Sequence, residues 1–114
     1  LLAEHFDSQW RIQRDGQRFF FEPGHQYEWS WLMGRYQNVT GRNLLSTRLR
    51  LFENAERAER QPDLHNVFDQ VWNDFSIKAR SSRFWPQCER IKCAAQLAIE
   101  HPTETRFKNS ATEG

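Results

Sequence analysis

The chain contains 114 residues, a length that suits one domain and is too short for two domains of ordinary size. Its 16 Lys and Arg residues nearly balance 15 Asp and Glu residues, and because the two signs alternate along the chain we expect no nucleic-acid partner. Aromatic residues make up 14% of the sequence, which excludes a disordered chain, since disordered segments lack large apolar side chains.

The cellular compartment is constrained by what the sequence lacks. Its apolar runs are far shorter than the roughly 20 residues of a membrane span, so we expect no membrane partner. The opening residues, LLAEHFDSQWR, have no signal-peptide pattern. Cys88 and Cys93 would point in different directions on a helix and have no metal-binding spacing. We therefore expect two free thiols, no metal ligands and a cytoplasmic protein.

In the first half of the chain we expect a short helical segment, a turn and one long helix. Residues 1–6 fit the last turns of a helix. Asp15 and Gly16 form a turn signal between two short segments, which is typical of a hairpin or ordered loop. A helix is predicted from about residue 24 to 38, because Pro23 suits a helix entrance and Gly41 suits a helix exit.

The second half is predicted to contain three helices and one hairpin. From about residue 43 to 60, apolar residues recur at spacings of three and four and charged residues fill most of the rest, so this helix buries one stripe. The Asn-Asp pair at 73–74 predicts a short hairpin or loop. The next helix is predicted over 86–100, and a last helix is predicted to begin near Thr103 as its N-cap.

These helices differ in how much of their surface is apolar. The helices at 24–38 and 86–100 carry apolar residues in most directions around the axis, which predicts burial on all sides, whereas the helix at 43–60 has one apolar stripe. The alternation predicts an all-α fold of inner and outer helices with short hairpin loops, as in an α/α barrel or a helical solenoid.

Candidate catalytic residues lie at the start of the predicted helix 24–38. His25 and Glu28 are three apart and share one face of the first turn, so they can interact. The positive end of the helix dipole and the charge of Glu28 act on the imidazole in opposite directions, so His25 can exchange protons near neutral pH. A carboxylate that fixes its tautomer would make His25 a general base.

Side chains near the two helix starts suit a carbohydrate, because aromatic faces pack on the C–H bonds of a sugar ring and polar groups bind its hydroxyls. The candidates are Tyr27, Trp29, Trp31, Trp10 and Trp85 among the aromatics, and Glu28, Glu89, Gln26 and Gln87 among the polar groups. The same residues also allow a structural interpretation, with a capping histidine, core tryptophans and glutamates that offset the helix dipole. Spacing alone leaves both interpretations open.

Two motifs resemble the N-acylglucosamine 2-epimerase family, which also includes aldose–ketose isomerases of mannose and related sugars and the cellobiose 2-epimerases. EPGHQYEWSWLM at 22–33 is similar to the family's P-G-H-x-x-E-W signature, and RFWPQCERIKC at 83–93 is similar to its W-P-Q-x-E helix start. The resemblance implies a portion of an (α/α)6 barrel. It also implies histidine acid/base catalysis that moves a proton at C2 of an open-chain sugar, without a metal or redox cofactor.

By this resemblance, His25 takes part in proton transfer and Glu28 supports it, while Trp85 and Glu89 lie near the bound monosaccharide or amino sugar. Trp29 is a further substrate-binding candidate because of its aromatic face. Residues 1–114 would supply about four of the twelve barrel helices, as part of a single domain incomplete at both ends. The remainder of the barrel is therefore an expected partner. Because the family's other histidines match nothing here, we expect the chain alone to be weak or inactive.

Several alternatives stay open on the sequence. It does not separate an epimerase from an aldose–ketose isomerase, or a free sugar from a phosphorylated one. A homodimer is a possible assembly, and the sequence shows no nucleotide effector site. A non-catalytic carbohydrate-binding module and a helical protein-interaction fragment are the competing functional hypotheses.

Overall fold

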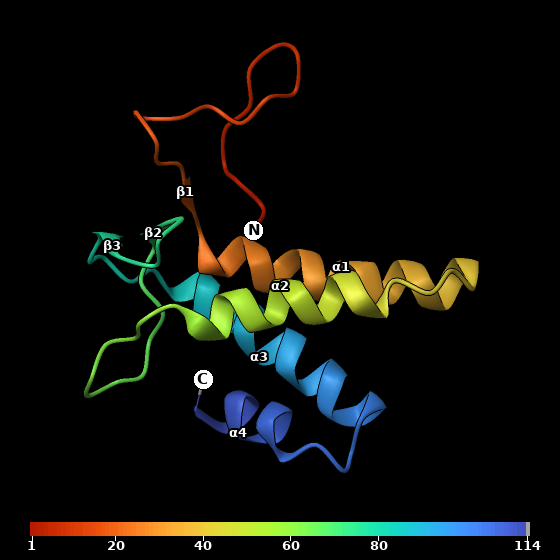
Figure 1. Cartoon of the computed structure of the whole chain (residues 1–114). Helices are drawn as coiled ribbons and strands as arrows, with labels where there is room; N and C mark the ends of the chain where they lie inside the picture. Colours follow the sequence, from red (N-terminus) through yellow and green to blue (C-terminus); the bar gives the residue numbers. More distant parts are fainter. Residues whose placement is uncertain (114) are drawn as a thin grey trace.

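The computed structural model describes residues 1–113, which form four helices and a small antiparallel sheet (Figure 1). The helices and strands, in chain order, are β1 Phe20–Phe21, α1 Pro23–Thr40, α2 Leu45–Arg57, β2 Gln70–Trp72, β3 Ile77–Ala79, α3 Phe84–Glu100 and α4 Thr105–Glu113. Helix α1 packs against both α2 and α3, and α4 packs against α3. Among the described residues, no helix is both long and apolar enough to cross a membrane.

The ends of α1 follow from two residues with restricted or unusual backbone geometry. Pro23 occupies the first helical position, where its fixed φ suits the helix and its missing N–H costs nothing. Gly41 ends the helix in the left-handed conformation, with φ of 74°, and its N–H donates to the carbonyl of Gln37 over 2.8 Å. The predicted helix at 24–38 is therefore confirmed, with slightly wider bounds.

The other predicted helices are also present, with shifted ends. Helix α2 is shorter than the predicted span of 43–60. Helix α3 begins two residues before Pro86, because Arg83 supplies the extended residue at its entrance and Pro86 still fits in the first turn. The last helix begins at Thr105, so the predicted N-cap role of Thr103 is wrong; residues 102–103 lie in a turn instead.

A three-stranded sheet corrects the all-α prediction. The turn at 73–75 joins β2 and β3 as the sequence predicted, but β2 also pairs with β1, so that Phe20 lies opposite Trp72. Residues 1–6 are not helical, which is a second correction: they run as an irregular segment with an isolated bridge from Phe6 to Ile12. Both features depend on pairings that local sequence patterns do not encode.

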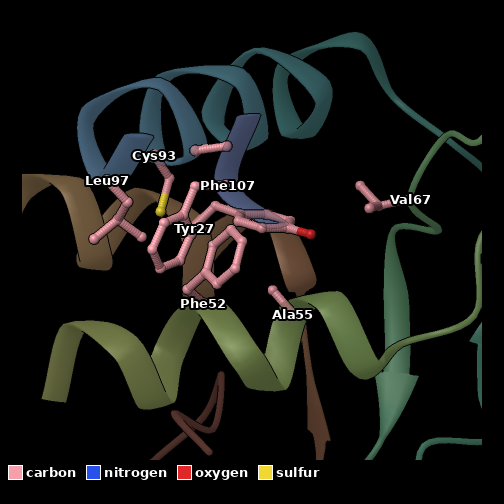
Figure 2. Close-up of a cluster of buried hydrophobic side chains, with 8 residues drawn as sticks. Tyr27, Phe52, Ala55, Val67, Cys93, Leu97 and Phe107 are labelled. Carbon is pink, nitrogen blue, oxygen red and sulfur yellow. The ribbon is translucent and has the colours of Figure 1, made fainter. Parts of the chain in front are cut away.

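The main core lies where side chains of all four helices meet (Figure 2). Tyr27 from α1, Phe52 from α2 and Phe107 from α4 meet edge to face, with ring centroids 6.1 and 5.2 Å apart. The buried members of this core are Tyr27, Phe52, Ala55, Val67, Cys93, Ala94, Leu97 and Phe107. Burial of each large side chain stabilises the fold by about 1.5–3 kcal/mol, so this cluster fixes the relative positions of all four helices.

Two arginines are buried within this helical packing. Arg48 of α2 is fully buried, and its guanidinium donates to Gln96 and Glu100 of α3, both over 2.8 Å. Arg90 of α3 is also fully buried and donates to Glu56 and Glu113. A buried charge is costly without partners, so these contacts hold α2, α3 and α4 together. Nη1 of Arg48 is buried without a hydrogen-bond partner among the described residues.

The prediction that α1 and α3 are buried on all sides is wrong for the described residues. Trp29, Leu32 and Tyr36 of α1 are 47%, 36% and 48% exposed, and Ile99 of α3 is 81% exposed. The buried apolar residues of α1 and α3 pack against α2 and α4. The four exposed side chains are not covered by another helix among residues 1–113. The helices thus carry more apolar surface than the chain itself covers.

Candidate active site

The N-terminal segment returns to the first turn of α1 and is held there by hydrogen bonds. Buried Gln26 clamps Leu2, because its side-chain nitrogen donates to the Leu2 carbonyl over 2.7 Å and its oxygen accepts from the Leu2 N–H over 3.2 Å. The N–H of Glu4 donates to the carbonyl of Phe20. Residues 2–4 therefore lie beside His25, although 21 residues separate Glu4 from His25 in the chain.

His25 makes its side-chain hydrogen bond with Glu4. The distance from His25 Nδ1 to Glu4 Oε2 is 2.8 Å, and the second oxygen of Glu4 accepts the backbone N–H of Glu22 over 2.8 Å. The sequence predicted Glu28 as the partner, from its spacing of three, and that pairing is wrong. The physical reason is that the N-terminal segment places Glu4 next to the imidazole, so the Glu4 carboxylate takes the hydrogen bond at Nδ1.

Trp85 lies on the other side of the imidazole. The ring centroids of His25 and Trp85 are 4.9 Å apart with an interplanar angle of 35°. This approach requires Gly24, since a Cβ built there would lie 2.7 Å from the Trp85 ring and 2.8 Å from Pro86. The starts of α1 and α3 are thus packed together, and the structure brings His25 and Trp85 into contact.

A charged group next to the histidine joins three parts of the chain. Glu22, at the entrance of α1, lies 3.7 Å from His25 Nδ1 and 3.0 Å from the guanidinium of Arg83. Arg83 also pairs with Asp69 at 3.2 Å. Burial alone would raise the pKa of Asp69, but its hydrogen bonds to Arg83 and Ser81 and the charge of Arg83 hold this pKa below its usual value. The negative charge near His25 is therefore partly offset by Arg83.

The same atoms have the spacing of a metal site, but they already have protein partners. Ligand atoms of Glu4, Glu22 and His25 lie within 4.8 Å of one another. Glu4 is bonded to the Glu22 N–H and to His25, while Glu22 is paired with Arg83 and accepts from Gln70. A cation here would compete with Arg83, so the donor set suits orientation of the imidazole better than metal binding.

An open cleft of about 360 Å³ lies beside the histidine. It is lined by Leu2, Ala3, Glu4, Phe6, His25, Glu28 and Trp29. Three of the five candidate site residues, His25, Glu28 and Trp29, therefore share one cleft. Its wall combines an aromatic face, two carboxylates and a half-exposed imidazole, which is a suitable set for a polyhydroxylated ligand.

Glu89 lies apart from this cleft. It is buried on α3, accepts a hydrogen bond from the indole N–H of Trp31 and pairs with Lys92 at 2.6 Å. The buried amide of Gln87 is likewise used internally, bonded to the backbone of Val67. Trp10 is 84% exposed in the N-terminal loop. Of the second motif, only Trp85 therefore reaches the histidine within this chain.

The comparisons with known proteins show the family to which the two motifs belong. The family model described as N-acylglucosamine 2-epimerase (GlcNAc 2-epimerase) matches residues 1–113. The chain belongs to this N-acylglucosamine 2-epimerase family. The resemblance inferred from the motifs at 22–33 and 83–93 is thus confirmed.

Two similar proteins are longer than this epimerase-family chain. A mannose-6-phosphate isomerase of Rhizobium meliloti (strain 1021) is 35% identical over 114 residues, which are 99% of the chain and 30% of that protein. The crystal structure of a D-mannose isomerase matches with a TM-score of 0.86 and 23% identity, over 98% of this chain and 31% of that one. The chain has the fold of the matching part and spans about a third of these relatives' length.

Three residues of this epimerase-family chain join the site without having been candidates. Glu4 and Glu22 lie next to His25, Arg83 pairs with Glu22, and Glu4 lies in the segment that the sequence predicted to be helical. Glu22 directly precedes the Pro-Gly entrance of α1, so its position in the sequence could have identified it as a site residue. No sequence pattern could have identified Glu4, because only the folded path of residues 1–6 brings it to the imidazole.

Proposed function

We propose that this chain is the part of a sugar epimerase or isomerase domain that carries one proton-transferring histidine. The observation that supports it most directly is the arrangement of His25, which contacts Glu4 through Nδ1 and Trp85 through its ring face, at a cleft shared with Glu28 and Trp29. A histidine with one nitrogen held by a carboxylate has its other nitrogen available as a general base.

The proposed reaction starts from the open-chain form of an aldose. A base removes the proton from C2, the C–H electrons form a C1=C2 double bond, and the C1 carbonyl oxygen takes up a proton to give an enediol. Return of a proton to the opposite face of C2, with the C1 hydroxyl losing its proton to restore the aldehyde, gives the epimer. Return of the proton to C1, with the C2 hydroxyl losing its proton, gives the ketose. In this scheme His25 carries one of the two proton transfers.

The other candidate residues have supporting roles. Glu28 lines the cleft and is placed to bind a sugar hydroxyl, and Trp29 lines it with an aromatic face for the C–H bonds of the sugar. Trp85 packs on His25 and would lie near the sugar behind the imidazole. Glu89 acts from further along α3 through Trp31, whose indole N–H it accepts. We propose no cofactor, because proton transfer at C2 needs only an acid and a base.

The remaining helices of an (α/α)6 barrel would supply what the chain lacks. The exposed apolar side chains of α1 and α3, including Leu32, Tyr36 and Ile99, would pack against them, and a second acid/base group would complete the proton transfers. On this proposal the matching segment of about a third of the relatives' length holds only part of the site.

Proton exchange in deuterated water tests the function. The intact protein would be incubated with mannose, glucose and N-acetylmannosamine, and deuterium at C2 would be followed by NMR. We expect exchange with at least one sugar, its loss in His25→Ala with sugar affinity retained, and little exchange from residues 1–114 alone. Unchanged exchange in His25→Ala would refute the role of His25, and sugar binding without exchange in the wild type would indicate a binding module.

A further inference from the structure

The carboxylate of Glu4 is oriented by the backbone on both sides of it. One oxygen accepts the N–H of Glu22 over 2.8 Å, and the Glu4 N–H donates to Phe20 over 3.3 Å. The side chain is only 13% exposed. A carboxylate held in this way presents its remaining oxygen in one direction, and that oxygen lies 2.8 Å from His25 Nδ1.

This contact determines which imidazole nitrogen carries the proton. An ionised carboxylate can only accept hydrogen bonds, so Nδ1 of neutral His25 must be the protonated nitrogen. Nε2 then has a free lone pair. A 180° flip of the imidazole about χ2 would place Cδ2 instead of Nδ1 toward Glu4. The tilted ring of Trp85, with its centroid 4.9 Å from that of the imidazole, hinders this flip because the indole would have to move.

We propose that Glu4 is a positioning residue that holds His25 in the Nδ1–H tautomer and so leaves Nε2 as the proton acceptor. The effect of Glu4 on catalysis rests on the proposed function, but the tautomer of His25 can be tested without a sugar. The other charged groups around the imidazole are Glu22 and Glu28 from α1 and its entrance, and Arg83 from the entrance of α3. Of these, only Glu4 lies within hydrogen-bond distance of Nδ1.

The variant Glu4→Gln makes a sharp prediction. The amide oxygen of glutamine can still accept the Glu22 N–H, and its NH2 group then faces Nδ1 as a donor. A donor at that position favours an unprotonated Nδ1. We therefore expect the substitution to move the proton of neutral His25 from Nδ1 to Nε2 with the N-terminal segment still in place.

The measurement is two-dimensional NMR of the chain with 15N-labelled histidine, which reports the protonation of each ring nitrogen. His25→Gln assigns the signals among His5, His25, His65 and His101. In the wild type we expect His25 protonated on Nδ1, in Glu4→Gln on Nε2, and in the control Glu53→Gln on Nδ1 as in the wild type. Glu53 suits this control because it is exposed on α2 and pairs with Arg106.

The outcomes separate this proposal from the proposed function. An Nε2–H tautomer in the wild type overturns it even if Glu4→Gln fails to fold, and an unchanged tautomer in a folded Glu4→Gln chain overturns it as well. In the intact protein, Glu4→Gln should lower kcat by roughly 100-fold or more while KM changes only a few-fold. If the intact wild type shows no C2 exchange, the proposed function fails, and the tautomer result still decides the role of Glu4.

Discussion

The indole of Trp85 lies against Gly24, so the first turns of α3 and α1 meet through an aromatic ring and a residue without a side chain. A Cβ at Gly24 would lie 2.7 Å from the ring, closer than real Cβ contacts allow. The same indole packs on the imidazole of His25. The glycine of the Pro-Gly pair therefore sets how near the tryptophan can come to the histidine.

Substitution Gly24→Ala should destabilise the chain and move Trp85. Overpacking of a tight contact costs about 1–3 kcal/mol, more than a helix gains from alanine in place of glycine near its first turn. We expect urea denaturation to give a free energy of unfolding about 1–2 kcal/mol lower than that of the wild type.

A double-mutant cycle with Trp85→Ala identifies the cause of this loss. Once the indole is absent, most of the cost of Gly24→Ala should vanish, because the clash no longer exists. An equal cost in both backgrounds would show that the loss comes from the backbone of α1 rather than from the contact with Trp85.

The positions of the helices could be predicted from the sequence, because Pro23, Gly41 and the spacing of apolar residues act locally. The pairing of β1 with β2 could not be predicted, since the two strands lie about 50 residues apart and each is only two or three residues long. Short strands carry too little periodicity to specify a partner.

In the candidate site, too, some residues could be predicted from the sequence and others could not. His25, Glu28 and Trp29 belong to one motif on one helix, so their shared cleft follows from the predicted helix. Glu4 reaches the imidazole only through the path of the N-terminal segment. Arg48 shows that the same holds for the core. The sequence pattern predicts that it lies on the charged surface of α2, yet it is fully buried, with Gln96 and Glu100 of α3 accepting its hydrogen bonds.

Glu56 should make folding stability depend on pH in the acid range. Burial alone would raise its pKa, but hydrogen bonds from Ser110 and Tyr27 and the charges of Arg90 and Arg60 hold the folded-state pKa below 4.5. Since the folded-state pKa is the lower one, the stabilisation is complete above about pH 4.5 and is lost as pH falls through the folded-state pKa.

Urea denaturation of Glu56→Gln near pH 6 and near pH 3 measures this contribution. Near pH 6 the variant should unfold with a free energy about 2 kcal/mol lower than the wild type, because hydrogen bonds to a charged group are lost, and the difference should shrink near pH 3. The control Glu53→Gln alters an exposed carboxylate one turn away and should cost less than about 0.5 kcal/mol. A constant difference between the two pH values would contradict the role of the Glu56 charge.

The two cysteines should differ in reactivity by a wide margin. Cys93 is fully buried, and burial raises the pKa of its thiol from 9.0 to about 12, which lowers its thiolate fraction roughly 1,000-fold at neutral pH. Cys88 is only partly buried. We expect a thiol reagent to modify one residue in the native chain, and Cys88→Ala to abolish that rapid phase. Rapid labelling of the Cys88→Ala variant without denaturant would show that Cys93 is accessible.

The apolar face of α1 should make the isolated chain self-associate. Trp29, Leu32 and Tyr36 are partly exposed and lie at helical spacings of three and four, so they form one continuous apolar strip. A charge placed in this strip by Leu32→Glu should oppose burial against any apolar partner. We expect sedimentation velocity to show a concentration-dependent oligomer for the wild type and a larger monomer fraction for the variant.

Leu64→Glu changes an exposed leucine in a loop outside the strip and should leave the oligomer distribution as it is. A wild-type chain that stays monomeric at high concentration would contradict the prediction, and an equal effect of both variants would show that added charge alone, rather than this strip, controls the association.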